Sequence, residues 1–130
     1  MQLFESVSRW FAHNPMLRRM RHMPRVPVNE QAVVRVGPSD DVNLVLLRDI
    51  SSGGACIRTD MRLAKSDTIW MRVGSGTPEQ FDVTATVIAI RRQTAGFFTD
   101  YGLRLVEMNL DSARLLERFI ERRAAVTRAR

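Results

Sequence analysis

Residues 81–89 read Phe-Asp-Val-Thr-Ala-Thr-Val-Ile-Ala, a run in which apolar and polar side chains largely alternate. The odd-numbered positions carry the apolar side chains Phe81, Val83, Ala85, Val87 and Ala89. Positions 82, 84 and 86 carry Asp, Thr and Thr. Successive side chains of a β-strand point to opposite faces of a sheet, so this period of two predicts a strand with one buried face.

Similar short segments lie on both sides of this run. The candidate strands are Gln31–Val36, Asp41–Ile50, Gly54–Asp60, Asp67–Val73, Gln80–Arg92 and Thr99–Glu107. Turn-forming clusters separate several of them, at residues 37–39, 52–53, 74–78 and 93–96. Five or six short antiparallel strands joined by such turns predict a mostly β fold, built as a small closed barrel.

An amphipathic segment precedes the strand region, in residues 1–15. Its apolar side chains recur at helical spacing and are Leu3, Phe4, Val7, Trp10 and Phe11. Pro15 ends this predicted helix, because the residue before a proline is pushed out of the α region. The apolar stripe can pack on the barrel, or it can contact a second subunit or another protein, and the pattern leaves both open.

A second helix is expected after the last strand, capped by Asn109 or Asp111. Its apolar stripe comprises Ala113, Leu116, Phe119 and Ile120. The expected organisation is an N-terminal amphipathic helix at 1–15, a basic linker at 16–27, a barrel with its C-terminal helix at 28–122, and a frayed basic tail at 123–130.

The composition is that of one soluble globular domain with a strong positive charge. The 130 residues are 45% hydrophobic and 26% charged, and the formal net charge is +6. Such a charge favours anionic partners such as nucleotides, nucleic acid or acidic surfaces. Arginine provides 19 of the 20 basic residues, and its planar fork suits phosphate and guanine. A codon bias towards arginine explains the composition equally well.

Several classes of protein are disfavoured. Cys56 is the single cysteine, so no disulfide framework is expected, and its apolar neighbours predict a small buried side chain. No apolar run approaches the roughly 20 residues that span a bilayer, and the N-terminus does not resemble a secretion signal, so we expect a cytoplasmic protein. His13 and His22 are the only histidines and lie near no nucleophile. We therefore expect neither catalysis, nor a metal, nor a cofactor.

Two polar motifs carry the functional signal. Arg21 and Arg25 form R-x-x-x-R in the linker, and Asp49, Ser51 and Gly54 form D-x-S-x-x-G near the end of the second candidate strand. An arginine can bind guanine O6 and N7, or a phosphate, with two parallel hydrogen bonds. Asp49 and Ser51 project from the same face of a strand, where a carboxylate can accept from the guanine N1 and N2 hydrogens. The alternative is that the second motif is a polar turn closing a hairpin.

Arginines four apart recur in this chain, so it is the pair of motifs, in this order, that is informative. The pair resembles the signature of PilZ domains, bacterial receptors for cyclic di-GMP, over roughly residues 18–122. The resemblance implies a six-stranded antiparallel barrel with a C-terminal helix, and an arginine segment that folds over a ligand on the outer barrel face. The ligand-binding residues that it implies are Arg21, Arg25, Asp49, Ser51 and Gly54, with Arg18, Arg19, Gly53 and Arg58 as further candidates. Residues 86–89 lack the aromatic side chain that many members place there.

The expected function is that of a cyclic di-GMP receptor that changes conformation and signals to an unidentified downstream protein. The regulated process, the number of ligand molecules and the formation of a homodimer stay open. One alternative is a basic barrel that binds RNA or single-stranded DNA, for which Phe97, Phe98 and Tyr101 would form an exposed aromatic cluster near Arg91 and Arg92. The other alternative is a PilZ-like protein adaptor that binds no nucleotide.

Overall fold

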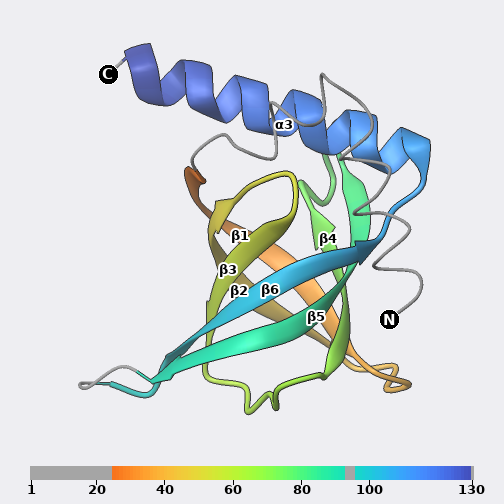
Figure 1. The fold of residues 1–130 in the computed structure, drawn as a ribbon, viewed down its shortest axis with the longest axis vertical. Helices are drawn as coiled ribbons and strands as arrows, with labels where there is room; N and C mark the ends of the chain where they lie inside the picture. Colours follow the sequence, from red (N-terminus) through yellow and green to blue (C-terminus); the bar gives the residue numbers. More distant parts are fainter. Residues whose placement is uncertain (1–24, 93–95, 130) are drawn as a thin grey trace.

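The alternating run forms the first part of β5 (Phe81–Arg92) in the computed structural model, which describes residues 25–92 and 96–129. The other elements are β1 (Val26–Val36), β2 (Val42–Ile50), β3 (Gly54–Thr59), β4 (Thr68–Val73), β6 (Thr99–Glu107) and α3 (Leu110–Ala129). Figure 1 shows the strands wrapped around a common interior, with α3 across one end. The helix expected at residues 1–15 lies outside the described residues.

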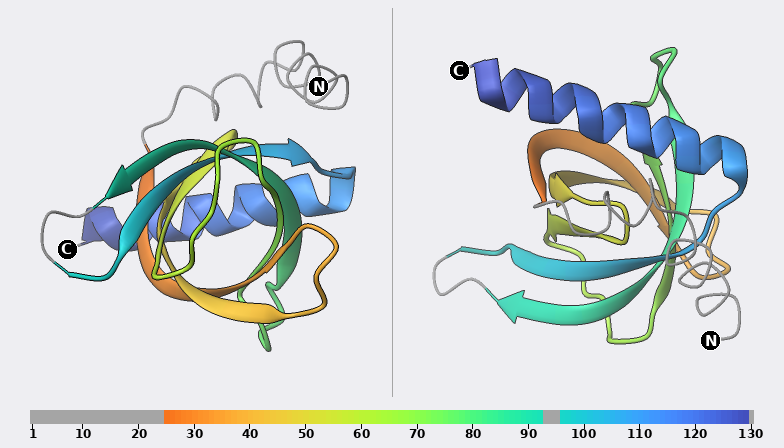
Figure 2. Two further views of the ribbon diagram at one scale, coloured as in Figure 1. Left: turned by 90° about the horizontal axis from the view of Figure 1, so that it is seen from below. Right: turned by 45° about the horizontal axis from the view of Figure 1, so that its top comes forward.

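The sheet closes on itself in the order β1-β2-β3-β6-β5-β4, and all of its pairs are antiparallel. Closure follows because β1 pairs with β2 on one side and with β4 on the other. The view along the barrel in Figure 2 shows this ring of strands. The predicted mostly β fold, a six-stranded antiparallel barrel followed by a C-terminal helix, is confirmed.

The side chains of β5 follow the predicted alternation over most of the strand. The buried ones are Phe81, Val83, Ala85 and Val87. After Val87 the pairing with β6 changes register, and Ala89 lies opposite Gly102. Ala89 is therefore only half-buried, and the expectation that it shares the buried face is wrong. The reason is a β-bulge, which shifts the alternation by one residue.

The first strand begins earlier than its sequence pattern indicates. Val26 already pairs with Ile50, and Pro27 pairs with Asp49, so the last two residues of the expected linker lie in β1. The register then shifts between Pro27 and Glu30, and Asn29 there adopts a φ of 54°. Asparagine tolerates this left-handed conformation better than most residues do. Because of this irregularity, the alternation of apolar and polar side chains does not mark the start of the strand.

Helix α3 covers one open end of the barrel (Figures 1 and 2). Of the two candidate caps, Asn109 fills the role, because its side-chain Oδ1 accepts a hydrogen bond from the Ser112 backbone N–H at 2.8 Å. The predicted apolar stripe of Ala113, Leu116, Phe119 and Ile120 is buried. The ring of Phe119 meets Phe81 edge-on, with the ring centroids 5.6 Å apart.

The helix continues through Ala129, so the expectation of a frayed tail beginning at residue 123 is wrong. Two ion pairs with the barrel and one contact within the helix involve the residues at which this extension begins. Arg123 forms an ion pair with Glu30 of β1, and its guanidinium lies 4.8 Å from the centre of the Phe119 ring. Arg122 pairs with Glu79 in the β4–β5 connection. Among the helical residues described here, no stretch is both long and apolar enough to cross a bilayer.

Candidate functional site

The two motifs meet on the outer surface of the barrel. The Arg25 Nη1 atom lies 3.2 Å from Asp49 Oδ1, and both side chains are partly exposed, at 46% and 31%. Asp49 reaches the outside because the register of β2 against β3 shifts between Leu47 and Asp49. This bulge directs Arg48 outwards as well as Asp49, whereas Leu47 is buried. The exposed Arg25–Asp49 pair is open to competition from a ligand that offers a phosphate or a guanine edge.

Ser51 closes the turn between β2 and β3. Its backbone N–H donates to the Gly54 carbonyl at 2.8 Å, and its Oγ accepts from the Gly54 N–H at 3.2 Å. Ser51 follows the end of β2, separated from Asp49 by the fully buried Ile50, and its side chain is partly buried. The hairpin-closing interpretation of the second motif therefore holds for Ser51, and it is compatible with a ligand above the turn.

The two glycines of the motif have different environments. A Cβ atom on Gly54 would lie 2.8 Å from the Leu103 carbonyl oxygen and 3.4 Å from Arg25 Nη2. Gly54 thus allows β3 and β6 to approach each other and allows the Arg25 guanidinium to lie over the backbone. A Cβ atom on Gly53 would meet nothing within 4 Å. Steric exclusion therefore explains the glycine at 54 and not the glycine at 53.

Small residues form the floor of the outer face beside this pair. Across β2, β3, β6 and β5, the paired positions run from Asp49 to Cys56, Gly102 and Ala89. Cys56 is only half-buried, so the expectation of a buried cysteine is wrong, because position 56 points outwards from β3. Burial is the main cause that raises the pKa of the Cys56 thiol, with Asp49 and Asp100 adding to it, so the thiol stays protonated at neutral pH. The floor side chains at Cys56, Gly102 and Ala89 are therefore small and uncharged.

Arginines lie on both sides of this floor. Arg104 is exposed and lies opposite Gly54 in the register of β3 with β6. On the other side, Arg58 binds Asp100 in a bidentate manner, with Nε–Oδ1 and Nη2–Oδ2 distances of 2.7 and 3.1 Å. Arg48 approaches the same carboxylate at 3.5 Å. The hydrogen bond from Arg58 is the main cause that lowers the pKa of Asp100.

Three residues near this face belong to neither sequence motif: Arg48, Asp100 and Arg104. No local pattern marks these residues, because the register of β2, β3 and β6 brings them to the face from separate strands. Arg58, a further candidate from the sequence, does lie on this face, but Asp100 already occupies two of its guanidinium donors.

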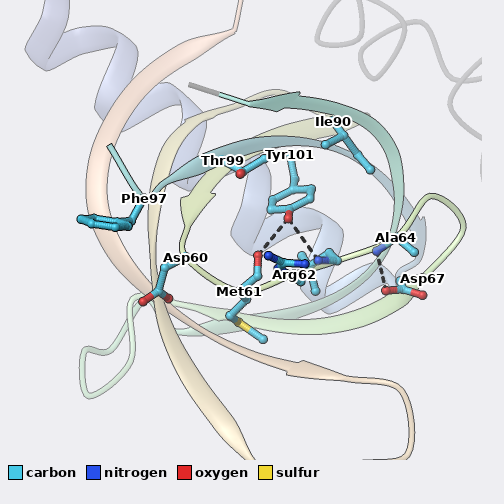
Figure 3. A pocket seen from close by; sticks show the side chains of 10 residues that line it. Asp60, Met61, Arg62, Ala64, Asp67, Ile90, Phe97, Thr99 and Tyr101 are labelled. Atoms are coloured by element: carbon cyan, nitrogen blue, oxygen red, sulfur yellow. Dashed lines mark hydrogen bonds between the residues drawn. The ribbon is translucent and has the colours of Figure 1, made fainter. Parts of the chain in front are cut away.

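The motif face does not coincide with either of two hollows among the described residues. One hollow, of about 540 Å³, is lined by residues of the β3–β4 connection and of β5 and β6 (Figure 3). The other, of about 510 Å³, includes Arg58 and Phe98. Neither is lined by Arg25 or Asp49. Tyr101, expected in an exposed aromatic cluster, is only 3% exposed, because its register position points inwards.

The described residues contain no group of three His, Cys, Asp or Glu side chains placed to hold a metal ion. The motif face combines arginines, the carboxylates of Asp49 and Asp100, and a floor of small residues. This combination suits a planar, anionic ligand.

The family model of the PilZ domain matches residues 19–122. The chain belongs to the PilZ domain family. The match covers both motif segments of this PilZ domain, including Arg21 and Arg25. Arg19 also lies within it, whereas Arg18 precedes it. The structure describes Arg25 of the arginine motif. Three other candidates lie outside the described residues: Arg18, Arg19 and Arg21.

Solved structures show the same fold. The PilZ domain of YcgR from Escherichia coli, solved with c-di-GMP, is 19% identical and gives a TM-score of 0.64, covering 84% of this chain and 95% of that one. The Bacillus subtilis inhibitor of motility MotI/DgrA is 16% identical with a TM-score of 0.61, covering 80% of this chain and 51% of that one. The K. pneumonia MrkH–c-di-GMP complex is 14% identical with a TM-score of 0.63, covering 83% and 53%.

This PilZ domain thus spans about half the length of the MotI/DgrA and MrkH chains. Sequence comparison with curated proteins found no match. At these identities the similarity to the solved structures concerns the fold.

Proposed function

We propose that this PilZ domain is a receptor for cyclic di-GMP, which it binds on the outer face of β2, β3, β6 and β5. Family membership supports the proposal, as do the related folds of YcgR and MrkH, whose structures were solved with c-di-GMP. The observation that carries it is the Arg25–Asp49 pair over Gly54, which brings residues of both motifs together on an exposed surface.

The chemistry of the ligand matches the groups on this face. The Arg25 guanidinium can turn from Asp49 to a phosphate or to guanine O6 and N7, and it gains a bidentate, charge-assisted contact there. The Asp49 carboxylate can then accept from the guanine N1–H and N2–H groups, which adenine does not present. Gly54 and Gly102 leave room for a planar base to lie close to the backbone. Arg104 adds positive charge for the second phosphate.

Binding transmits a signal through the part of the arginine segment that precedes β1, residues 17–25. A ligand that contacts both this segment and the Asp49 side of the barrel fixes one relative to the other. The ligand makes more contacts when the segment lies against the barrel, so binding favours that arrangement over the free one. A downstream protein recognises the surface of the ligand-bound arrangement. The protein acts by binding and catalyses no reaction in this scheme.

The proposal is tested by calorimetric titration with cyclic di-GMP at physiological salt, comparing wild type with Arg25→Ala, Asp49→Ala and Arg114→Ala. Because a charge-assisted hydrogen bond contributes about 1.5–3 kcal/mol, Arg25→Ala should weaken binding roughly ten- to a hundredfold. Asp49→Ala should weaken it in the same direction. Arg114 is an exposed arginine on α3, away from the motif face, so Arg114→Ala is the matched control and should keep wild-type affinity.

GTP and a short single-stranded oligonucleotide complete the experiment. Saturable binding of the cyclic dinucleotide alone supports the receptor, and the stoichiometry gives the number of ligand molecules. Salt-sensitive binding of the oligonucleotide without binding of the dinucleotide would identify a nucleic-acid module instead. An absence of binding to all three would leave a PilZ adaptor. Wild-type affinity in both Arg25→Ala and Asp49→Ala would refute the assignment of the site.

A further inference from the structure

Strand β5 is longer than its neighbour β4, so part of its edge is open. β4 pairs with β5 from Phe81 to Thr86, and the last backbone bonds on this side join Val87 to Ser66 and Asp67. From Ile88 to Arg92, the strand pairs described for β5 are with β6 alone. Alternate N–H and C=O groups of this stretch therefore face away from the sheet, as they do at any edge strand. The barrel is closed elsewhere, and this projecting part of β5 and β6 is visible at the lower left of Figure 1.

The larger hollow lies between this projecting part and the β3–β4 connection, residues 60–67. Ile90 lies opposite Tyr101 in the register with β6, and both side chains line the hollow, together with Phe97 (Figure 3). The Tyr101 hydroxyl donates to the Met61 carbonyl at 2.8 Å and accepts from the Leu63 N–H at 3.1 Å. These two bonds hold the connection in place, so the hollow of about 540 Å³ is preformed.

Exposed apolar side chains gather around this hollow. Phe97 is 91% exposed and Phe98 is 52% exposed, and the partly exposed Ile90 lines the same hollow as Phe97. Phe98 and Leu44 line the second hollow, which shares Asp60 with the first. A single exposed apolar residue is ordinary, but several that line neighbouring hollows are typical of an interaction surface.

The charges at this surface indicate the kind of partner. Arg62, Lys65 and Arg91 are exposed around the hollow and the edge. Asp60 is exposed there too, whereas the Asp67 carboxylate accepts a hydrogen bond from the Ala64 N–H at 2.8 Å. Both carboxylates keep their charge, so three basic side chains against two acidic ones leave a local charge of +1, the same sign as the net charge of +6. A second copy would bring like charges together, whereas an acidic segment would complement them.

We propose that an extended, acidic segment of a partner protein adds as a strand to the open edge of β5 at Ile88–Arg92. Side chains of an added strand alternate between the two faces of the sheet. One apolar side chain of the segment enters the hollow beside Ile90 and Phe97. The neighbouring acidic side chain lies on the opposite face, beside Arg91. The docking surface does not include the Arg25–Asp49 pair, although it shares Ala89 with the floor beside that pair, and the proposal does not depend on a nucleotide ligand.

The experiment selects binders from a phage-displayed library of random linear peptides on the immobilised full-length chain. We expect enriched sequences in which apolar and acidic residues alternate. Synthetic versions should bind wild type and Val42→Arg alike, but bind Ile90→Arg at least about tenfold more weakly, a loss of about 1.4 kcal/mol. Val42 is an exposed apolar strand residue that lines neither hollow, so it receives the matched substitution. Bound peptide should slow amide hydrogen exchange at residues 88–92.

A second variant distinguishes a loss of peptide binding from a loss of folded structure. Phe97→Arg changes a side chain that is almost fully exposed, and it should also weaken peptide binding while the circular dichroism spectrum stays unchanged. The proposal is overturned if no selected peptide distinguishes Ile90→Arg and Phe97→Arg from Val42→Arg, or if the selected peptides are basic. Self-association of wild type in analytical ultracentrifugation that Ile90→Arg abolishes would assign the edge to a second copy and would equally overturn the proposal.

Discussion

Gly54 links the architecture to the candidate site. A Cβ atom there would overlap the Leu103 carbonyl oxygen of β6, at 2.8 Å, and would crowd the Arg25 guanidinium. Backbone cannot give way as a flexible side chain can, so we expect Gly54→Ala to lower the free energy of unfolding by about 1–3 kcal/mol. Urea denaturation followed by circular dichroism measures this difference.

The neighbouring glycine provides the control. Gly53→Ala places its Cβ in open space, and its φ lies outside the left-handed region. The free energy of unfolding should therefore change by less than about 1 kcal/mol, in either direction. Equal destabilisation by the two substitutions would show that close approach of β3 and β6 is not the reason for the glycine at 54.

Among the strands, Asp100 of β6 connects Arg58 of β3 and Arg48 of β2. The hydrogen bond from Arg58 lowers the pKa of Asp100 in the folded state below its usual value of 3.8. A lowered pKa means that the folded state favours the carboxylate, so the interaction stabilises the fold above the unfolded pKa. This contribution is lost as the pH falls below about 4, through the folded-state pKa.

Asp100→Asn should therefore reduce the loss of stability on acidification. Thermal unfolding recorded between neutral pH and about pH 2 should show a shallower decline for this variant than for wild type. The residual decline comes in part from Asp82, whose pKa is lowered chiefly by its hydrogen bond from Arg72. Asp40→Asn, at an exposed position before β2, is the matched control and should follow the wild-type curve. Identical curves for wild type and Asp100→Asn would contradict the assigned interaction.

Helix α3 is attached to the barrel by its buried stripe. Phe119 is buried against Phe81 and Ile120 follows it in the core. Phe119→Ala should lower the free energy of unfolding by about 3–5 kcal/mol, because it removes a large core side chain and leaves a cavity. Val126 is half-exposed near the end of the same helix, and Val126→Ala should cost less than about 0.5 kcal/mol. Guanidinium denaturation of both variants tests whether α3 belongs to the cooperative unit.

For the molecule as a whole, ligand binding should appear as added stability. A ligand that binds the folded state alone, at a hundred times its Kd, adds about 2.7 kcal/mol to the free energy of unfolding. We therefore expect cyclic di-GMP to raise the melting temperature of wild type in a concentration-dependent manner, with a single transition. At the same concentration, Arg25→Ala should show little or no rise. A melting temperature that ligand does not change in wild type would contradict the proposed function.

Most of the barrel can be predicted from local patterns. Five of the six candidate strands coincide with observed strands to within one residue at each end, and α3 has the predicted stripe and one of the two predicted caps. The departures have local causes. The bulge at residues 87–89 turns Ala89 outwards, and the left-handed Asn29 obscures the start of β1. The end of α3 contacts the barrel through the ion pair of Arg123 with Glu30 of β1, which the sequence of the helix does not reveal.

The amino-acid sequence determines the strands, the turns and the two motifs, because alternation, turn chemistry and motif spacing are properties of neighbouring residues. Local sequence patterns do not determine the register between strands that are far apart in the chain. The register of β1 with β2 places Arg25 against Asp49. The registers of β2, β3 and β6 bring Arg48, Arg58 and Arg104 to the same face. The pairing of β5 with β4 stops at Thr86, which leaves one edge at the end of β5 open. These arrangements depend on pairing between segments far apart in the chain, and a shift of one residue would reverse the face of every side chain. The outer face and the open edge therefore exist only once the barrel has closed.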